Sequence, residues 1–179
     1  MSTMLIKNGR VIDGTGAASI NADVLVKDGK IAAIGTITEP ADQVIDAAGL
    51  AVAPGFIDTH SHSDLDVLLR PQVLPKVMQG ITTELLGQDG VSMAPLPTQY
   101  ISPWRKNLAG LDGDTDEIDW TYETTDNYLK MIEKAHPGLN EMYLVPHGNI
   151  RMEAMGLDNR LPTDEEIEKM KAITRREME

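Results

Sequence analysis

The sequence contains no cysteine among its 179 residues. This absence excludes disulfide frameworks, cysteine-based zinc ribbons and thiol nucleophiles. The chain also lacks any run that approaches the ~18 apolar residues of a membrane span, and residues 1–10 lack the basic-then-apolar pattern of a signal peptide. We therefore expect a soluble, cytoplasmic protein.

Basic residues are scarce. The 16 Lys and Arg residues stand against 28 Asp and Glu residues, which gives a formal net charge of −12. Such a surface repels phosphate backbones and anionic lipid headgroups, so we expect neither nucleic acid nor a membrane as a partner. Hydrophobic residues make up 41% of the chain, which is enough for a buried core and argues against wholesale disorder.

The first part of the chain has the pattern of short strands and turns. Asn8-Gly9 and Asp28-Gly29 are each flanked by apolar runs, and both pairs favour the type I′ turn of a hairpin. A small sheet of this kind needs a partner layer, because isolated hairpins are marginal in water. The strands predicted here are 5–6 with 11–12, 22–26 with 31–35, then 43–46 and 49–52.

From Pro54 onward, strands alternate with helices. This alternation is typical of βα units around a parallel sheet. A closed eight-stranded barrel takes ~250 residues, so these units would form an incomplete one. The last helix reaches Glu179 without a glycine or proline stop, which favours a truncated chain; a complete small α/β domain with a frayed end is the alternative. The predicted elements are strands 56–60, 82–86 and 142–145, and helices 73–79, 128–135 and one that begins at the capping box of Thr163 and Glu166.

Asp58, His60 and His62 form the sharpest chemical motif. Residues two apart on a strand point to the same side, so the two imidazoles would project together from the carboxyl end of a strand. Two converging neutral imidazoles are a natural zinc-type pair. Asp58 lies one pleat deeper and could accept the proton of a ligand histidine. The alternative is two ordinary polar histidines in a strand-to-helix turn.

Residues 53–62 (APGFIDTHSH) resemble the metal-binding opening of the amidohydrolase superfamily, and the early hairpins resemble its β-sandwich. Residues 79–83, 87–95 and 144–151 are most similar to the D-aminoacylase branch. The resemblance implies an α/β fold with a small β-sandwich portion at residues 1–52 and the first βα units of a (β/α)8 barrel at residues 53–179. It implies one or two divalent metals, zinc above all, and hydrolysis of a small-molecule N-acyl-D-amino acid to a D-amino acid and a carboxylate.

The resemblance also suggests roles for other residues. Asp89 stands where the best-known deacylases carry a zinc-ligating cysteine, and we expect it to be a third, weaker ligand; Glu84 is a lesser substitute. His147, expected at the end of the third strand, is a candidate for binding substrate; a buried, hydrogen-bonded histidine is the alternative. The remaining metal histidines and the catalytic aspartate of the family come from later strands, so we assign no catalytic residue before Glu179 and expect the isolated chain to be inactive.

Two other functions stay open. One is a cyclic-amide hydrolase of the dihydroorotase or hydantoinase type, and the other is a non-catalytic, partner-dependent metal-binding fragment. A separate motif, residues 112–123, resembles a calcium-binding loop, but Glu117 replaces the required glycine. We therefore expect a solvated acidic loop there.

Overall fold

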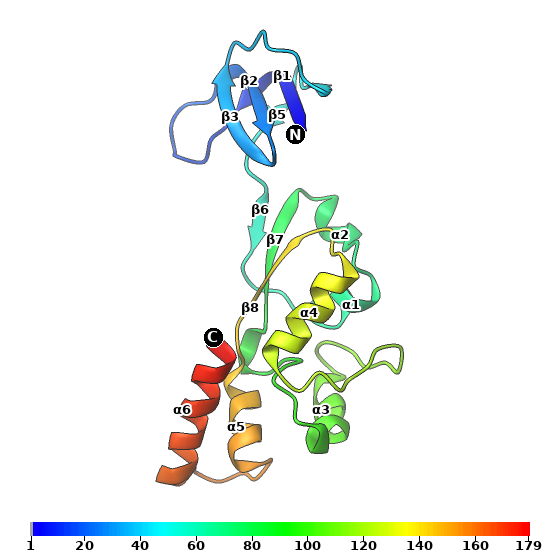
Figure 1. Cartoon of the computed structure of the whole chain (residues 1–179), viewed down its shortest axis with the longest axis vertical. Helices are drawn as coiled ribbons and strands as arrows, with labels where there is room; N and C mark the ends of the chain where they lie inside the picture. Colours follow the sequence, from blue (N-terminus) through cyan, green and yellow to red (C-terminus); the bar gives the residue numbers. More distant parts are fainter. Residues whose placement is uncertain (1) are drawn as a thin grey trace. The chain divides into compact units, whose positions relative to one another are not determined.

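The computed structural model describes residues 2–179 and shows an α/β protein (Figure 1). The chain divides into two compact units, Met1–Pro54 and Gly55–Glu179. Within the described residues, no helix combines the length and the apolar character that crossing a membrane requires.

The first unit is one five-stranded sheet. β1 lies at its centre and pairs antiparallel with β2 and parallel with β4 and β5, and β2 pairs antiparallel with β3. The strands are β1 (Thr3–Val11), β2 (Ile20–Lys27), β3 (Lys30–Gly35), β4 (Gln43–Asp46) and β5 (Ala51–Val52). Several large apolar side chains of this unit are exposed, namely Ile20, Ile31, Ile34, Val44, Ile45 and Leu50.

The hairpin predicted at Asp28-Gly29 is confirmed. Both residues have positive φ, 49° for Asp28 and 75° for Gly29, as a type I′ turn demands. Lys27 and Lys30 are the pair that closes the hairpin between β2 and β3.

The hairpin predicted at Asn8-Gly9 is wrong. β1 runs straight through this pair, which forms a bulge where the register against β2 shifts. Asn8 does take the positive φ of a turn, 60°, but its N–H donates to the carboxylate of Asp23 on β2 at 2.9 Å, so the strand continues. A Cβ on Gly9 would lie 2.5 Å from Cγ2 of Val52, so close packing is what requires the glycine.

The second unit is a three-stranded parallel sheet with helices, as the alternating pattern predicted. The strand order is β6-β7-β8. The strands are β6 (Phe56–Asp58), β7 (Ile81–Leu86) and β8 (Asn140–Tyr143). The helices are α1 (Asp66–Leu69), α2 (Leu74–Val77), α3 (Ile101–Leu108), α4 (Thr125–Ala135), α5 (His147–Met155) and α6 (Asp164–Met178), with short 3-10 turns η1 (Gln88–Gly90) and η2 (Thr98–Tyr100).

Capping explains where α4 and α6 begin. The hydroxyl of Thr124 accepts the N–H of Asn127 at 3.2 Å to start α4, and Tyr128 and Ile132 bury one face of that helix. Thr163 and Glu166 form the predicted capping box of α6, which lies beside α5 (Figure 1).

Three helices, α1, α3 and α5, escaped the sequence analysis, and α2 is shorter than predicted. α3 lies in a stretch where no helix or strand was predicted; its Pro103 is in the first turn, where a helix tolerates proline. α5 is buried on several sides and lacks an apolar stripe, so its periodicity is weak. The helix predicted at residues 73–79 is only the four-residue α2, because Val73 is left-handed with φ 42°.

The core of the second unit includes residues from β7, α3 and α4 and from the loop after β7. Leu86, Met93, Trp104, Tyr128 and Ile132 are among its buried members. Tyr128 also donates its hydroxyl to the carbonyl of Asp64 at 2.7 Å, deep in this core. The loops that follow β6 and β7 are thereby fixed against the helices, and these two loops carry the candidate ligands.

Candidate metal centre

His60 and His62 lie in the loop directly after β6. The strand ends at Asp58, whose carboxylate accepts the backbone N–H of His60 at 3.2 Å and so shapes the start of the loop. The two imidazole rings meet edge to face, with their centroids 5.3 Å apart. The spacing of two residues therefore brings both rings together, although neither histidine belongs to the strand.

Asp89 comes from η1, at the end of the neighbouring strand β7. It sits in the left-handed region with φ 58°. Gly87, two residues earlier, also has a positive φ of 77°, and a side chain there would collide with the carbonyl oxygen of Leu144. This tight turn directs the carboxylate of Asp89 toward the loop after β6.

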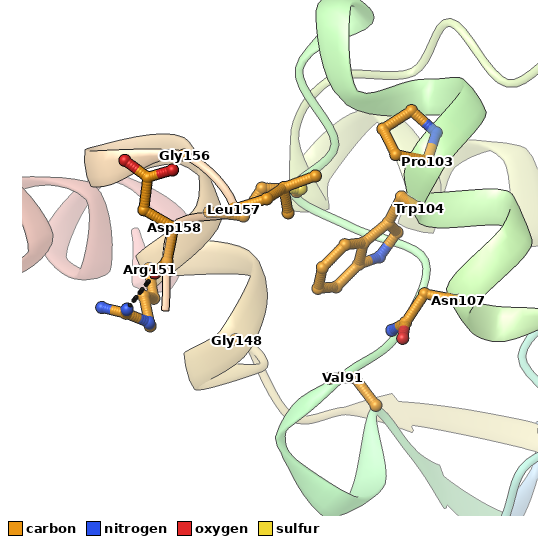
Figure 2. A pocket seen from close by; sticks show the side chains of 10 residues that line it. Val91, Pro103, Trp104, Asn107, Gly148, Arg151, Gly156, Leu157 and Asp158 are labelled. Atoms are coloured by element: carbon orange, nitrogen blue, oxygen red, sulfur yellow. Dashed lines mark hydrogen bonds between the residues drawn. The ribbon is translucent and has the colours of Figure 1, made fainter. Parts of the chain in front are cut away.

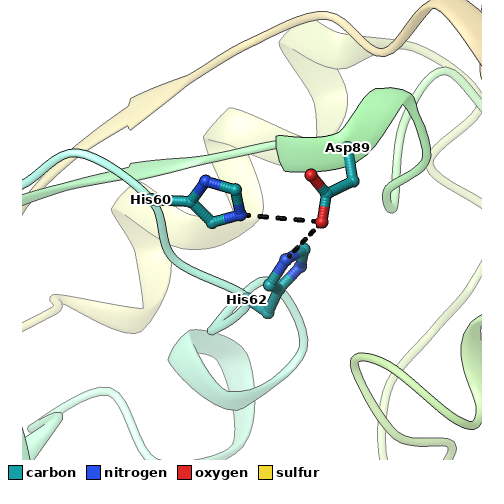
Figure 3. A group of neighbouring side chains, drawn as sticks. All are labelled: His60, His62 and Asp89. Atoms are coloured by element: carbon teal, nitrogen blue, oxygen red, sulfur yellow. Dashed lines mark hydrogen bonds and ion pairs between the residues drawn. The ribbon is translucent and has the colours of Figure 1, made fainter.

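The three side chains converge on one point (Figure 3). Oδ2 of Asp89 lies 3.1 Å from Nε2 of His62 and 3.6 Å from Nε2 of His60. One ligand atom from each residue falls within 4.8 Å of the others. With metal–ligand bonds of 2.0–2.1 Å, two ligand atoms of a tetrahedral zinc are about 3.3 Å apart. Two imidazole nitrogens and one carboxylate oxygen at these separations are a donor set that fits a zinc ion.

The partners of Asp58 differ from those expected. Besides the N–H of His60, its carboxylate accepts Nζ of Lys76 at 2.8 Å, and no imidazole nitrogen is among its hydrogen-bond partners in residues 2–179. The lysine, together with the N–H of His60, holds the pKa of Asp58 below its usual value. Asp58 thus shapes the backbone of the histidine loop rather than contacting a ring.

Two aspartates, Asp64 and Asp112, lie near Nδ1, the other ring nitrogen of His62. Nδ1 of His62 is 3.4 Å from Oδ1 of Asp112, and the Asp112 side chain is only 1% exposed. Burial, followed by the nearby charge of Asp64, raises the pKa of Asp112 to about 7. Burial also raises the pKa of Asp64.

The expectation of a solvated acidic loop is therefore wrong for its first residue. Asp114 and Asp116 do lie at the surface, where they pair with Arg105 at 2.6 and 2.7 Å. Asp112 turns inward to His62 instead. Sequence reasoning missed it because the two residues are 50 positions apart and no local pattern marks the contact.

Glu84 is not part of the ligand cluster. Its side chain is fully buried on β7, where it accepts the hydroxyl of Ser61 at 2.6 Å and also pairs with Lys76. Glu141 lies next to it on β8, and burial, followed by the charge of Glu84, raises the pKa of Glu141 to about 8. Lys76 thus lies among carboxyl groups of three adjacent strands, of which that of Glu84 is fully buried.

His147 is exposed at the first turn of α5, four residues after the end of β8. A cavity of about 360 Å³ lies nearby, between α3 and α5, and His147 does not line it (Figure 2). Trp104 and Asn107 line this cavity from α3, and Arg151 lines it from α5 while donating to the carbonyl of Asp158 at 2.7 Å. The structure does not bring His147 into the ligand cluster.

Asn149 is a second residue that sequence reasoning missed. It is fully buried, and its amide group donates to the carbonyls of Ser92 and Pro95 at 2.8 and 3.0 Å. Its carbonyl accepts the N–H of Ser92 at 3.1 Å. These bonds hold the chain just after the turn that carries Asp89. In the sequence, the only sign of this role is a polar residue within a segment of weak periodicity.

Known proteins are similar to this chain in sequence. The chain is 38% identical over 170 residues to an N-acyl-D-aspartate deacylase of Alcaligenes xylosoxydans xylosoxydans, and the match covers 94% of this chain and 33% of that protein. It is 35% identical to a D-aminoacylase of the same organism, over 98% of this chain and 35% of the relative. The chain thus spans about a third of the length of the curated relatives it matches.

A solved structure is also similar to this chain. The N-acyl-D-glutamate deacylase from Bordetella bronchiseptica, complexed with zinc and a phosphonate inhibitor, superposes with a TM-score of 0.85 at 37% identity, over 98% of this chain and 36% of that one. The sequence model of the amidohydrolase family matches residues 43–179, which include His60, His62 and Asp89. The chain belongs to the amidohydrolase family.

Proposed function

We propose that this chain supplies part of the metal site of an enzyme that hydrolyses a linear amide, converting an N-acyl-D-amino acid and water to a D-amino acid and a carboxylate. The observation that carries the proposal is the convergence of His60 and His62 on Asp89 at the carboxyl ends of adjacent parallel strands. Barrel enzymes keep their chemistry at this end. The deacylases to which the chain is similar support an N-acyl amino acid as the substrate.

The proposal includes a finer description of the fold. Residues 1–52 form a small β-sandwich portion, and residues 53–179 form the first βα units of an incomplete (β/α)8 barrel. The exposed apolar side chains of the first sheet, among them Ile31 and Val44, support a missing second layer. In the second unit, Ile57 and Met142 are 62% and 54% exposed, which supports further barrel packing over them.

His60, His62 and Asp89 would hold the zinc ion. When bound, zinc supplies Lewis-acid chemistry, since it lowers the pKa of water and polarises a carbonyl group. The carboxylate of Asp89 is a harder ligand than a thiolate, so the chain holds the metal less tightly than a cysteine-containing relative would. We assign neither the general base nor any further ligand to these 179 residues.

The test uses the longest polypeptide that the reading frame through Glu179 encodes. After loading with one and then two equivalents of zinc, it is assayed on the N-acetyl derivatives of D-aspartate, D-glutamate and their L-enantiomers, and on a hydantoin. We expect zinc-dependent release of the D-amino acid alone. Turnover of the hydantoin alone would contradict the proposal and favour a cyclic-amide hydrolase.

Variants connect any activity to the residues described here. His60→Ala should remove bound zinc and activity together. His136→Asn is the matched control, because His136 ends α4 in a left-handed conformation that asparagine tolerates. Unchanged zinc content in His60→Ala would remove the metal assignment.

A further inference from the structure

The second ring nitrogen of His62, Nδ1, faces the carboxylate of Asp112. Nδ1 is buried and lies 3.4 Å from Oδ1 of Asp112. Within residues 2–179, neither atom has a hydrogen-bond partner that satisfies normal geometry. The two atoms are therefore available to each other, on the side of the ring opposite Asp89.

The contacts of Asp112 within residues 2–179 indicate no other role for its side chain. Its side chain is 1% exposed, and neither carboxylate oxygen accepts a hydrogen bond from the described residues. A buried carboxylate without a donor costs free energy, so a specific donor is expected nearby. The neighbouring Asp64 is different, because its Oδ1 accepts the N–H of Gly87 at 2.9 Å and the hydroxyl of Ser92.

We propose that Asp112 is a positioning residue for His62: its carboxylate accepts the Nδ1–H and so keeps the imidazole in the tautomer whose Nε2 lone pair faces Asp89 and His60. The proposal rests on the proposed role of His60, His62 and Asp89 as metal ligands. A histidine ligand commonly donates its free N–H to a carboxylate, which fixes the ring and makes the ligating nitrogen more basic. Asp112 supplies that carboxylate from a loop far along the chain.

A cation held by His62, Asp64 and Asp112 is the competing interpretation. One ligand atom from each of these residues also lies within 4.8 Å of the others. However, a neutral imidazole has one lone-pair nitrogen and one N–H. If Nδ1 bound a cation, Nε2 would carry the proton and could not join His60 and Asp89. A hydrogen bond to Asp112 leaves Nε2 free, so the two interpretations differ in the tautomer of His62.

The first measurement needs no variant. Nitrogen NMR of the histidine rings in the zinc-free chain, with His62 identified by its absence from His62→Gln, reports which ring nitrogen carries the proton. We expect the Nδ1–H tautomer. An Nε2–H tautomer would overturn the proposal, and this result does not depend on whether zinc binds.

The second measurement is zinc affinity, by competition with a chelator. Asp112→Asn keeps the shape but places an N–H donor near Nδ1, so we expect the tautomer to switch and the affinity to fall about 10- to 100-fold. Asp114→Asn is the matched control. Asp114 lies in the same loop as Asp112 but pairs with Arg105 of α3, so this variant should change neither the tautomer of His62 nor the zinc affinity. Folding of each variant is checked by the fluorescence of the buried Trp104 and Trp120.

The outcomes separate this inference from the proposed function. Unchanged affinity and tautomer in a folded Asp112→Asn variant would overturn the role of Asp112. A second zinc equivalent that is lost in Asp112→Asn would also overturn it, because Asp112 would then be a ligand. If His60→Ala and the unaltered chain bind zinc equally, the proposed metal site fails, while the tautomer of His62 still decides the role of Asp112.

Discussion

Lys76 is the cation that pairs with the carboxyl groups of Asp58 and Glu84 in the parallel sheet. Its Nζ lies 2.8 Å from Oδ2 of Asp58 and pairs with Glu84, which is 0% exposed, while the lysine itself is 19% exposed. Lys76→Met keeps the length of the side chain and removes the charge. Asp58 and Glu84 would then lie in the sheet without a counter-charge, beside Glu141 on the next strand.

The size of the effect follows from these contacts. Two opposite charges about 4 Å apart attract by about 4 kcal/mol at an effective dielectric constant of 20, and Lys76 makes two such contacts. Protonation of a glutamate relieves part of the loss, because burial and Glu84 already raise the pKa of Glu141 to about 8. Removing one partner of a buried pair costs about 3–5 kcal/mol, and we expect Lys76→Met to lower the free energy of unfolding by that amount.

Urea denaturation followed by tryptophan fluorescence measures the change. Both tryptophans, Trp104 and Trp120, are buried in the second unit, so the signal reports the unit that contains Lys76. Lys130→Met is the control, since the exposed pair of Lys130 with Asp126 should contribute at most about 1 kcal/mol.

A double-mutant cycle tests the physical reason. In a Glu84→Gln background the buried charge is absent, so Lys76→Met should cost less, with a coupling of about 1–3 kcal/mol between the two positions. If the two effects add to within about 0.5 kcal/mol, Lys76 acts through packing and the electrostatic argument is refuted.

Three further predictions concern the same strands and loops. Glu141→Gln should flatten the pH dependence of stability. The pKa of Glu141 is about 8 in the folded protein against the ordinary 4.5, so its contribution to stability is complete below about pH 4.5 and is lost as the pH rises through 8. Equal slopes of the free energy of unfolding against pH in both proteins, measured by urea titration, would contradict this. Gly87→Ala should lower zinc affinity and stability together, because the new side chain meets the carbonyl of Leu144; a crystal structure with an unmoved Asp89 would disprove the reason. Asp89→Cys should bind zinc more tightly than the unaltered chain in chelator competition, since thiolate is the softer ligand, and weaker binding would count against Asp89 as a ligand.

Local rules predicted those parts of the fold that depend on a few neighbouring residues. The turn at Asp28-Gly29 needs two positive φ angles, and the sequence supplies two residues that tolerate them. The capping box of Thr163 and Glu166 is likewise complete within four residues. His60 and His62 were predicted to lie together from the alternation of a strand; they do, with centroids 5.3 Å apart, but β6 ends at Asp58 and the loop that follows it is what brings the rings together.

Features decided by packing were not predictable in this way. Asn8-Gly9 has the composition of a turn, yet Asp23 accepts the N–H of Asn8 and Val52 fills the space above Gly9, so the strand continues. The inward turn of Asp112 has the same kind of cause. Nothing in residues 112–116 distinguishes the first aspartate from the others, and only the fold places it against His62.

The candidate metal centre therefore joins contributions of different range. The spacing of His60 and His62 is set by covalent geometry, and Asp89 reaches them because β7 lies beside β6 in a parallel sheet, where strand ends meet at one edge. The turn at Gly87 converts that adjacency into contact, since a larger residue could not pass the carbonyl of Leu144 on the chain that follows β8. The geometry of His60, His62 and Asp89 thus depends on close packing across these three strands. A change at β8 that moves Leu144 should therefore disturb Asp89 without altering any of the three proposed ligands.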